Sequence, residues 1–251
     1  MPRQIVTTRY VTPLREGGSM PAVVEGDDLG LYVLKFRGAG QGPKALVAEL
    51  VAGRIGQALG LPVPELVFAD LDPELARTEP DSEIQHLIRE SAGLNLALDY
   101  LPGAANFDPV AGLPDAALAS RIVWFDSFVS NVDRTTRNPN LMVWHRALWL
   151  IDHGAALYFH HGWDTQAPDP SSAFPMVREH VLLPAASQIA QADAELAPKL
   201  DRALFDRVLA EVPDEWLGDA PAAVRARYVD YLTERLDRRA AFVEEARRAH
   251  G

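Results

Sequence analysis

The stretch SNVDRTTRNPNLMVW, residues 130–144, together with the tripeptide DHG at residues 152–154, decides how this sequence folds. It crowds acids, amides and arginines between a strongly apolar segment, residues 113–131, and two apolar runs within residues 140–154. The first segment predicts a helix and the second predicts a β-hairpin. Because packed elements flank the polar residues on both sides, we expect the scaffold to fix their positions.

Side chains in this stretch offer the oxygen atoms that a divalent metal ion requires. Asp133 follows the predicted helix, Asn138 and Asn140 precede the first hairpin strand, and Asp152 follows the second. A metal ion that bridges phosphates needs hard oxygen ligands from two converging elements, commonly one carboxylate and one amide. A separate carboxylate is needed near an attacking hydroxyl. Asp133, Asn138 and Asp152 meet that specification if the hairpin folds them together.

Two arginines of the same loop, Arg134 and Arg137, are candidates to neutralise transferred negative charge. The alternative interpretation of the loop is purely structural. Aspartate and asparagine side chains form turns with the backbone two residues further on, so the same residues could simply close the preceding helix. The loop alone does not decide between these interpretations.

The N-terminal part of the sequence places a lysine and a glutamate on consecutive elements. Strands are predicted at residues 5–12, 22–25 and 31–36, and a helix at residues 42–60. Lys35 lies in an otherwise apolar strand, where it either reaches along an edge to water or extends into a cleft to bind an anion. Glu49 shares its helix face with small residues only: Ala45, Ala52, Gly53 and Gly56. Such a face lets another backbone approach, so we expect Glu49 to point inward and pair with Lys35.

The turn Gly17-Gly18-Ser19 precedes both residues. Backbone N–H groups of a glycine-rich turn can cradle phosphate, although most turns of this composition are only turns.

The rest of the chain changes from mostly strand to mostly helix near residue 102. Strands are predicted at residues 61–72 and 93–103, helices at residues 81–90 and 113–131, and a long amphipathic helix at residues 221–250. The basic stretches RLDRR and EEARR of this last helix are expected on a solvated face. His160 and His161 invite a transition-metal interpretation, but we expect them in a strand, where adjacent side chains point to opposite faces.

The composition is that of an ordinary folded protein. The 251 residues are 48% hydrophobic and 24% charged, with a net charge of −11. This balance argues against binding nucleic acid or anionic membranes by bulk charge. The absence of cysteine excludes disulfides and fits a cytoplasmic protein, and no signal core or membrane-spanning run is present.

The order of these motifs resembles that of the protein-kinase-like superfamily, and within it the HipA-like kinases. The loop NVDRTTRN, residues 131–138, is similar to their Asn-x-Asp-x-x-x-basic-Asn loop, and its Asp-Arg start also resembles phosphoinositide kinases. DHG takes the place of the usual Asp-Phe-Gly. The resemblance implies an α+β, two-lobed protein-kinase-like fold: a small, mostly β N-terminal lobe at residues 1–101 and a larger helical lobe at residues 102–251, with the hairpin at the active site.

The resemblance also implies a role for each candidate residue. Lys35 would hold the ATP phosphates, Glu49 would pair with it, and Asp133 would be the catalytic base. Asp152 and Asn138 would bind Mg²⁺, with Asn140 as the alternative amide because related folds often place it immediately before the strand. The nucleotide-binding residues would be Gly17, Gly18, Ser19 and Lys35 near the phosphates, and Asp99, Tyr100 and Leu101 near the adenine.

We therefore predict an ATP- and Mg²⁺-dependent phosphotransferase. The resemblance favours a Ser or Thr hydroxyl of a protein as acceptor, and the alternatives are a small molecule or a lipid headgroup. A rival prediction from another class is a pseudokinase, which binds a nucleotide or a partner without catalysis. The sequence leaves the acceptor, any partner protein and the oligomeric state open.

Overall fold

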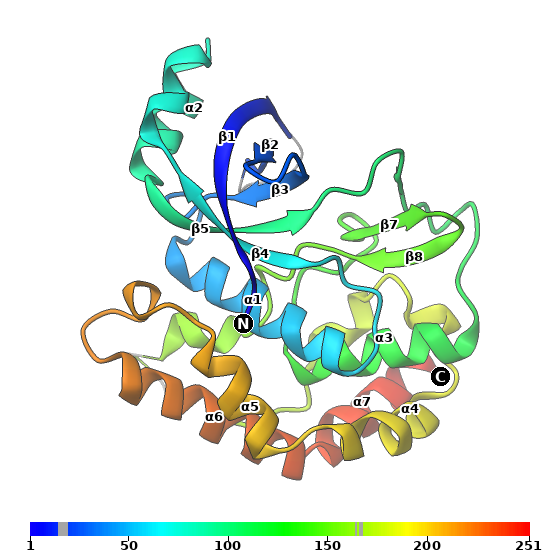
Figure 1. The fold of residues 1–251 in the computed structure, drawn as a ribbon. Coiled ribbons are helices and arrows are strands. Elements are labelled where there is room, and N and C mark those ends of the chain that lie inside the picture. The colour runs from blue at the N-terminus through cyan, green and yellow to red at the C-terminus, as the bar shows by residue number, and fades with distance from the viewer. Residues whose placement is uncertain (15–19, 164, 166–167) are drawn as a thin grey trace.

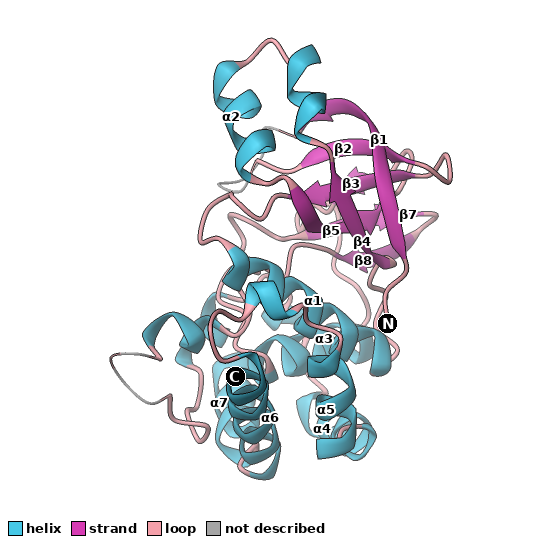
Figure 2. Cartoon of the chain, turned by 60° about the vertical axis from the view of Figure 1, so that its left-hand side comes forward, coloured by secondary structure: helices cyan, strands magenta, loops and turns pink. Residues whose placement is uncertain are grey.

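The computed structural model describes residues 1–14, 20–163, 165 and 168–251. It has a β-barrel at one end and a helical part at the other, with α2 beside the barrel (Figures 1 and 2). The strands are β1 (Gln4–Pro13), β2 (Ala22–Gly26), β3 (Leu31–Lys35), β4 (Leu66–Leu71), β5 (Gly93–Asp99), β6 (Ala105–Asn106), β7 (Leu141–Trp144) and β8 (Ala147–Leu150). The α-helices are α1 (Pro43–Ala58), α2 (Ser82–Glu90), α3 (Ala116–Phe128), α4 (Ile189–Leu196), α5 (Arg202–Ala210), α6 (Pro221–Asp237) and α7 (Ala240–His250). Short 3₁₀ helices are η1 (Pro73–Thr78), η2 (Tyr158–Gly162), η3 (Pro175–Glu179), η4 (Leu183–Ala185), η5 (Ala197–Lys199) and η6 (Asp214–Trp216).

The barrel is built from the strands that the sequence predicts. Its strand order is β1-β2-β3-β5-β4, and a parallel pairing of β1 with β4 closes it. Residues with buried side chains, among them Ile5, Val24 and Leu34, form a core inside the barrel. On β3, Lys35 pairs with Leu96 of β5, so the lysine lies at the end of a strand that is held on both sides.

Helix α1 lies between the barrel and the helices of the C-terminal half, as Figure 1 shows. An apolar stripe along this helix is buried throughout, with each of its members, Val47, Val51, Ile55 and Leu59, at most 1% exposed. The opposite, small-residue face is also covered. A side chain at Gly53 would meet Leu66 at 2.7 Å, and one at Gly56 would meet Val63 at 3.0 Å. Glu49 on this face is 1% exposed, so the expectation that it points inward is confirmed.

The predicted hairpin is present as β7 and β8, and β6 adds to its edge. Its two-residue turn has positive φ at both His145 (48°) and Arg146 (64°), the backbone sign that two-residue hairpin turns of the I′ type require. The backbone N–H of Leu150 donates to the carbonyl of Pro62, 2.8 Å away, which ties the hairpin to the segment before β4. The end of β8 is thereby brought next to the barrel.

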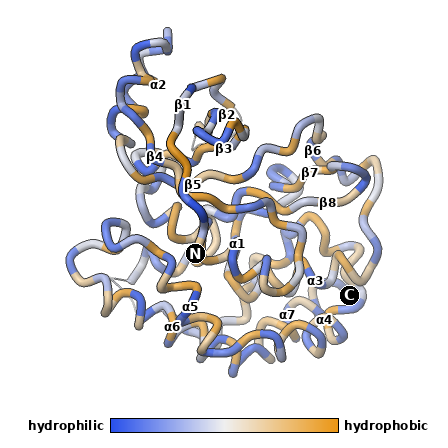
Figure 3. Tube along the Cα trace, in the orientation of Figure 1, coloured by the Kyte–Doolittle hydropathy of each residue, from blue (hydrophilic) through white to orange (hydrophobic). Residues whose placement is uncertain are grey.

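Two expectations about the C-terminal half are wrong. Residues 221–250 form two helices, α6 and α7, because the chain turns at residues 238–239 and brings Phe242 against Trp124 of α3, with ring centroids 5.7 Å apart. Figure 3 shows hydrophilic and hydrophobic residues mixed along both helices. Arg235 of the RLDRR stretch is also not solvated. It is fully buried and donates to the backbone carbonyls of Ser127 and Phe128 at 2.6 and 2.7 Å.

Candidate active site

Lys35 stands at the centre of a cluster of charged side chains where the barrel meets α1 and the hairpin. Its Nζ lies 2.7 Å from Oδ1 of Asp152 and 3.8 Å from Oε2 of Glu49. The lysine is 8% exposed, so it does not reach along an edge to water. The ion pair that the sequence predicts between Lys35 and Glu49 is therefore present, and Asp152 adds a second and shorter one.

The two buried partners keep each other charged. Burial by itself lowers the pKa of Lys35, but the charges of Asp152 and Glu49 outweigh it and the pKa is raised. Burial by itself raises the pKa of Glu49, but the charge of Lys35 and a hydrogen bond from His153 outweigh it and the pKa is lowered. An ammonium and a carboxylate consequently face each other at neutral pH.

His153, the middle residue of DHG, also reaches Glu49. Its Nδ1 lies 3.3 Å from Oε1 of Glu49, and since a carboxylate only accepts, the ring nitrogen is the donor. The ring is fully buried, with its centroid 5.8 Å from that of Phe125. Sequence analysis missed this contact. The signal that was available is the polar residue between Asp152 and Gly154, where an aromatic residue is usual.

The loop before the hairpin gathers two amides around one carboxylate. Oδ2 of Asp133 accepts hydrogen bonds from Nδ2 of Asn138 at 2.7 Å and from Nδ2 of Asn140 at 3.2 Å. No described residue donates to Oδ1 of Asp133. The turn itself is formed by Asn131, whose side chain accepts from the backbone N–H of Asp133 at 3.2 Å. The purely structural interpretation of the loop thus applies to Asn131, while the carboxylate of Asp133 takes no backbone bond from a described residue.

Asn140 and Asp152 lie on neighbouring backbone segments. The N–H of Ile151, next to Asp152, donates to the carbonyl of Asn140 at 3.1 Å. Both Asn140 (φ 49°) and Asp152 (φ 54°) have left-handed backbone conformations, which are uncommon for residues other than glycine. Such strain concentrates at functional sites, where the surrounding structure enforces it. Asn138, by contrast, is exposed.

The expectation that Arg134 neutralises transferred charge is wrong. Its guanidinium is 1% exposed and forms an ion pair with Asp126 of α3, with Nε 2.6 Å from Oδ2. It also donates to the backbone carbonyls of Asn140 and Ile151. Arg134 therefore links the two segments that carry Asn140 and Asp152. Its charge is paired with that of Asp126 inside the protein. Arg137 is exposed, as a residue that meets a substrate would be.

A comparison with protein families identifies the chain. The family described as HipA-like kinase matches residues 8–243, which is nearly the whole sequence. This chain belongs to the HipA-like kinase family. No curated protein sequence matches it.

Solved structures show that this kinase has a kinase-like α+β fold. The crystal structure of the Helicobacter pylori proinflammatory kinase CtkA has a TM-score of 0.55 and 13% identity, covering 100% of this chain and 98% of that chain. The Golgi casein kinase has a TM-score of 0.52 and 10% identity, covering 97% of this chain and 73% of that chain. A second structure of that enzyme, with Mn/ADP bound, has a TM-score of 0.53 and 10% identity over the same shares.

Other candidate residues of this HipA-like kinase lie apart from the charged cluster. Asp99 ends β5 opposite Tyr32, the N–H of Tyr100 donates to the carbonyl of Leu31 at 3.0 Å, and Leu101 is buried. Burial and the charge of Glu65 raise the pKa of Asp99. The Gly17-Gly18-Ser19 turn lies outside the described residues, so its predicted contact with phosphate stays a prediction.

The histidine pair is arranged differently from the expectation. Residues 158–162 form the 3₁₀ helix η2 and not a strand, and the Nε2 atoms of His160 and His161 lie 3.0 Å apart instead of on opposite faces. Nδ1 of His160 forms a hydrogen bond with the hydroxyl of Tyr228 at 2.8 Å. Among the described residues, no three histidine, aspartate or glutamate side chains converge as a ready metal site.

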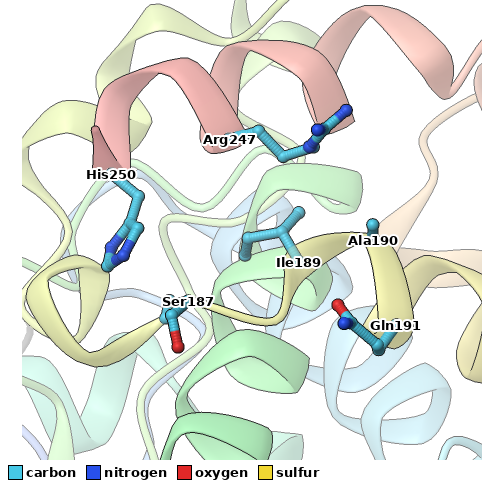
Figure 4. Close-up of a pocket in the computed structure, with 7 residues that line it drawn as sticks. Ser187, Ile189, Ala190, Gln191, Arg247 and His250 are labelled. Carbon is cyan, nitrogen blue, oxygen red and sulfur yellow. The ribbon is translucent and has the colours of Figure 1, made fainter.

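A hollow elsewhere on the kinase has no connection with the candidate residues. It lies between the start of α4 and the end of α7, and its lining includes Ser187, Ile189 and His250 (Figure 4). None of the predicted site residues lines it. None of the helices in the described part of the chain is long and apolar enough to cross a membrane.

Proposed function

We propose that this HipA-like kinase transfers the γ-phosphoryl group of ATP, with Mg²⁺, to a Ser or Thr hydroxyl of a protein. The observation that carries the proposal is the meeting of Lys35 with both Glu49 and Asp152. Three charged side chains meet here from three parts of the fold: Lys35 from strand β3, Glu49 from helix α1 and Asp152 from the segment after β8. The structure of the Golgi casein kinase with Mn/ADP bound supports a nucleotide and a divalent metal ion as ligands of this fold.

Lys35 and Glu49 would position the phosphates. A lysine on a barrel strand presents a compact point charge, and its pairing with a buried carboxylate fixes where that charge lies. Glu49 is 1% exposed and its helix is buried on nearly every side, so the carboxylate is held by a rigid element. In the ion pair as it stands, the ammonium is also bound by Asp152, and nucleotide binding would redirect it toward phosphate oxygens.

The oxygen atoms of Asp152 and Asn140 fit a magnesium ion. The Asp152 side chain is 34% exposed, and both residues are hard oxygen donors on adjoining backbone segments. We favour Asn140 over Asn138, because Asn140 is bonded to the residue before Asp152 while Asn138 is exposed. Mg²⁺, when bound there, supplies positive charge against the phosphates that are being separated.

Asp133 would act as the general base. Its Oδ2 is held by two amides, which leaves Oδ1 to accept the proton of the acceptor hydroxyl. The hydroxyl oxygen forms a bond to the γ-phosphorus as the bond from that phosphorus to the bridging oxygen of ADP breaks. The proton goes to Asp133, and ADP leaves with the electron pair of the broken bond.

We further propose that the barrel and the helical part work as two lobes, residues 1–101 and 102–251, with the nucleotide between them. Asp99, Tyr100 and Leu101 then lie at the crossing from one to the other, which suits contact with the adenine. Gly17, Gly18 and Ser19 would lie near the phosphates. The absence of cysteine in the sequence supports a cytoplasmic location.

Calorimetric titration with ATP, in the presence and absence of Mg²⁺, tests the proposed site. Asp152→Ala removes the carboxylate that holds both Lys35 and the metal ion, so we expect the Kd of Mg·ATP to rise about tenfold or more, which corresponds to about 1.4 kcal/mol. Asp237→Ala, at an exposed aspartate on the last turn of α6, is the matched control. Unchanged affinity of the Asp152 variant would refute the metal assignment. Binding by the wild type without phosphate transfer to any hydroxyl would favour the pseudokinase.

A further inference from the structure

His153, the residue after Asp152, contacts the other carboxylate of the charged cluster. Asp152 has a left-handed backbone conformation, and the two successive side chains contact different residues. Asp152 reaches Lys35, while His153 reaches Glu49 on α1. Gly154 also lies near this helix, because a Cβ built there would be in van der Waals contact, at 3.8 Å, with the Ala45 carbonyl and Oε2 of Glu49. The DHG segment is thus in contact with the helix that carries the buried carboxylate.

Glu49 is contacted by two residues from different elements, one through an ion pair and one through a hydrogen bond. Lys35 faces Oε2 at 3.8 Å, and the Nδ1–H of His153 faces Oε1 at 3.3 Å. No described residue donates a hydrogen bond to Oε2. The hydrogen bond from Nδ1 of His153 thus orients the Glu49 carboxylate, which together with Asp152, 2.7 Å from Nζ, surrounds the ammonium of Lys35.

Packing alone does not account for a histidine at this position. The ring contacts Phe125 edge-on, which a phenylalanine or leucine could also do. Burying an imidazole is costly unless its polar atoms are bonded, and Nε2 of His153 has no partner among the described residues. The polar contact that offsets the burial of the ring is the hydrogen bond from Nδ1 to Glu49.

We infer that His153 is a positioning residue for the phosphate-binding lysine. It acts through Glu49: the hydrogen bond from Nδ1 orients the carboxylate, the carboxylate orients Lys35, and the segment that carries Asp152 is thereby coupled to α1. The inference rests on the proposed function, because the quantity that it governs is the affinity for Mg·ATP. It adds a residue to which no role in the reaction has been assigned.

Substitutions that place a hydrogen-bond donor at the position of one ring nitrogen or the other test the inference. In His153→Asn the side-chain amide nitrogen takes the place of Nδ1, in His153→Gln it takes the place of Nε2, and His153→Phe keeps a ring without a donor. We expect the Kd of Mg·ATP, measured by calorimetry, to stay within about threefold of wild type for Asn and to rise about tenfold for Gln and Phe. Melting without nucleotide gives the stability of each variant, and His153→Leu replaces Phe if that variant does not fold.

A second background separates positioning from packing. In Glu49→Met the carboxylate is gone, so the difference between Asn and Phe at residue 153 should disappear. Equal Kd values for His153→Asn and His153→Phe with Glu49 intact would overturn the inference and leave the proposed function standing. Absence of Mg·ATP binding by the wild-type protein would overturn both.

Discussion

Asp133 and Arg134 are neighbours in the sequence, yet they belong to two clusters with opposite environments. Asp133 is half-buried, and its carboxylate faces the amides of Asn138 and Asn140 in the loop before the hairpin. Arg134 points the other way, into the protein. There it shares Asp126 with His180, whose Nε2 lies 2.9 Å from the same carboxylate oxygen.

The outer cluster consists of Asp133, Asn138 and Asn140, and the inner cluster consists of Asp126, Arg134 and His180. The outer cluster leaves one carboxylate oxygen of Asp133 without a donor from the described residues, as the proposed general base would require. The inner cluster has every charge paired: burial would raise the pKa of Asp126, but Arg134 and His180 hold it well below its usual range. The difference teaches that two charged residues side by side in the sequence can enter different environments, and that the face of the loop decides whether a side chain supports the backbone, as Arg134 does, or is left for the proposed chemistry, as Asp133 is.

Removing the carboxylate of Asp126 from the inner cluster should have the largest effect on stability. Asp126→Ala leaves the guanidinium of Arg134 buried without its counter-charge, and breaking a buried ion pair in this way typically costs about 3–5 kcal/mol. We expect the free energy of unfolding in urea to fall by that amount. Asp237→Ala, at an exposed position, is the control. A loss no larger than that of the control would contradict the structural role of the inner cluster.

The free energy of unfolding should depend on pH because of His160, a buried residue that, like the inner cluster, supports the fold and takes no part in the proposed chemistry. Burial, with the charges of His161 and Lys44, lowers the pKa of His160 to about 3. A histidine in the unfolded chain titrates near 6.5, so above this pH His160 is neutral in both the folded and the unfolded state. There it does not reduce the free energy of unfolding. Below it the unfolded state binds a proton that the folded state does not, and stability falls as pH falls, by about 1.4 kcal/mol per pH unit.

Urea unfolding between pH 6.5 and 5 measures this slope before most carboxylates titrate. His160→Gln should flatten it, while His86→Gln, at an exposed histidine, should not. An unaltered slope in the His160 variant would show that the pair in η2 does not stay neutral in the folded protein.

The smallest effect is expected at Arg137, the exposed arginine of the same loop. Arg137→Ala should change the free energy of unfolding by no more than about 0.5 kcal/mol, since substitutions at exposed positions away from caps and networks rarely do more. The same urea measurement compares it with Asp126→Ala. A loss of several kcal/mol would mean that Arg137, like Arg134, supports the fold.

The sequence predicts those parts of the site whose signals are local. Two apolar runs that flank His145 and Arg146 predict the hairpin, and the small residues Gly53 and Gly56 correctly indicate that Glu49 points inward. The ion pair with Lys35 follows from placing a strand and the next helix side by side. These predictions needed only periodicity and the size of neighbouring side chains.

Features that depend on distant partners could not be predicted. Arg134 and Arg137 look alike in the sequence, and what distinguishes them is that Arg134 has partners inside the protein, Asp126 on α3 and the carbonyls of Asn140 and Ile151. Arg235 is buried because the carbonyls of Ser127 and Phe128, more than a hundred residues earlier, accept its hydrogen bonds. The break between α6 and α7 likewise serves a contact with α3 that no local pattern records.

Phosphate transfer by Asp133→Asn tests most directly the claim that Asp133 carries chemistry while its neighbour carries structure. Asparagine preserves shape and removes the charge, so a residue that acts only in the transition state should lose rate and little else. We expect labelled-phosphate transfer from ATP, to the protein itself and to a lysate of its host, to fall about 10²–10⁴-fold. The affinity for Mg·ATP and the free energy of unfolding should stay near those of the wild type. Undiminished transfer by the variant would remove Asp133 from the mechanism and contradict the account.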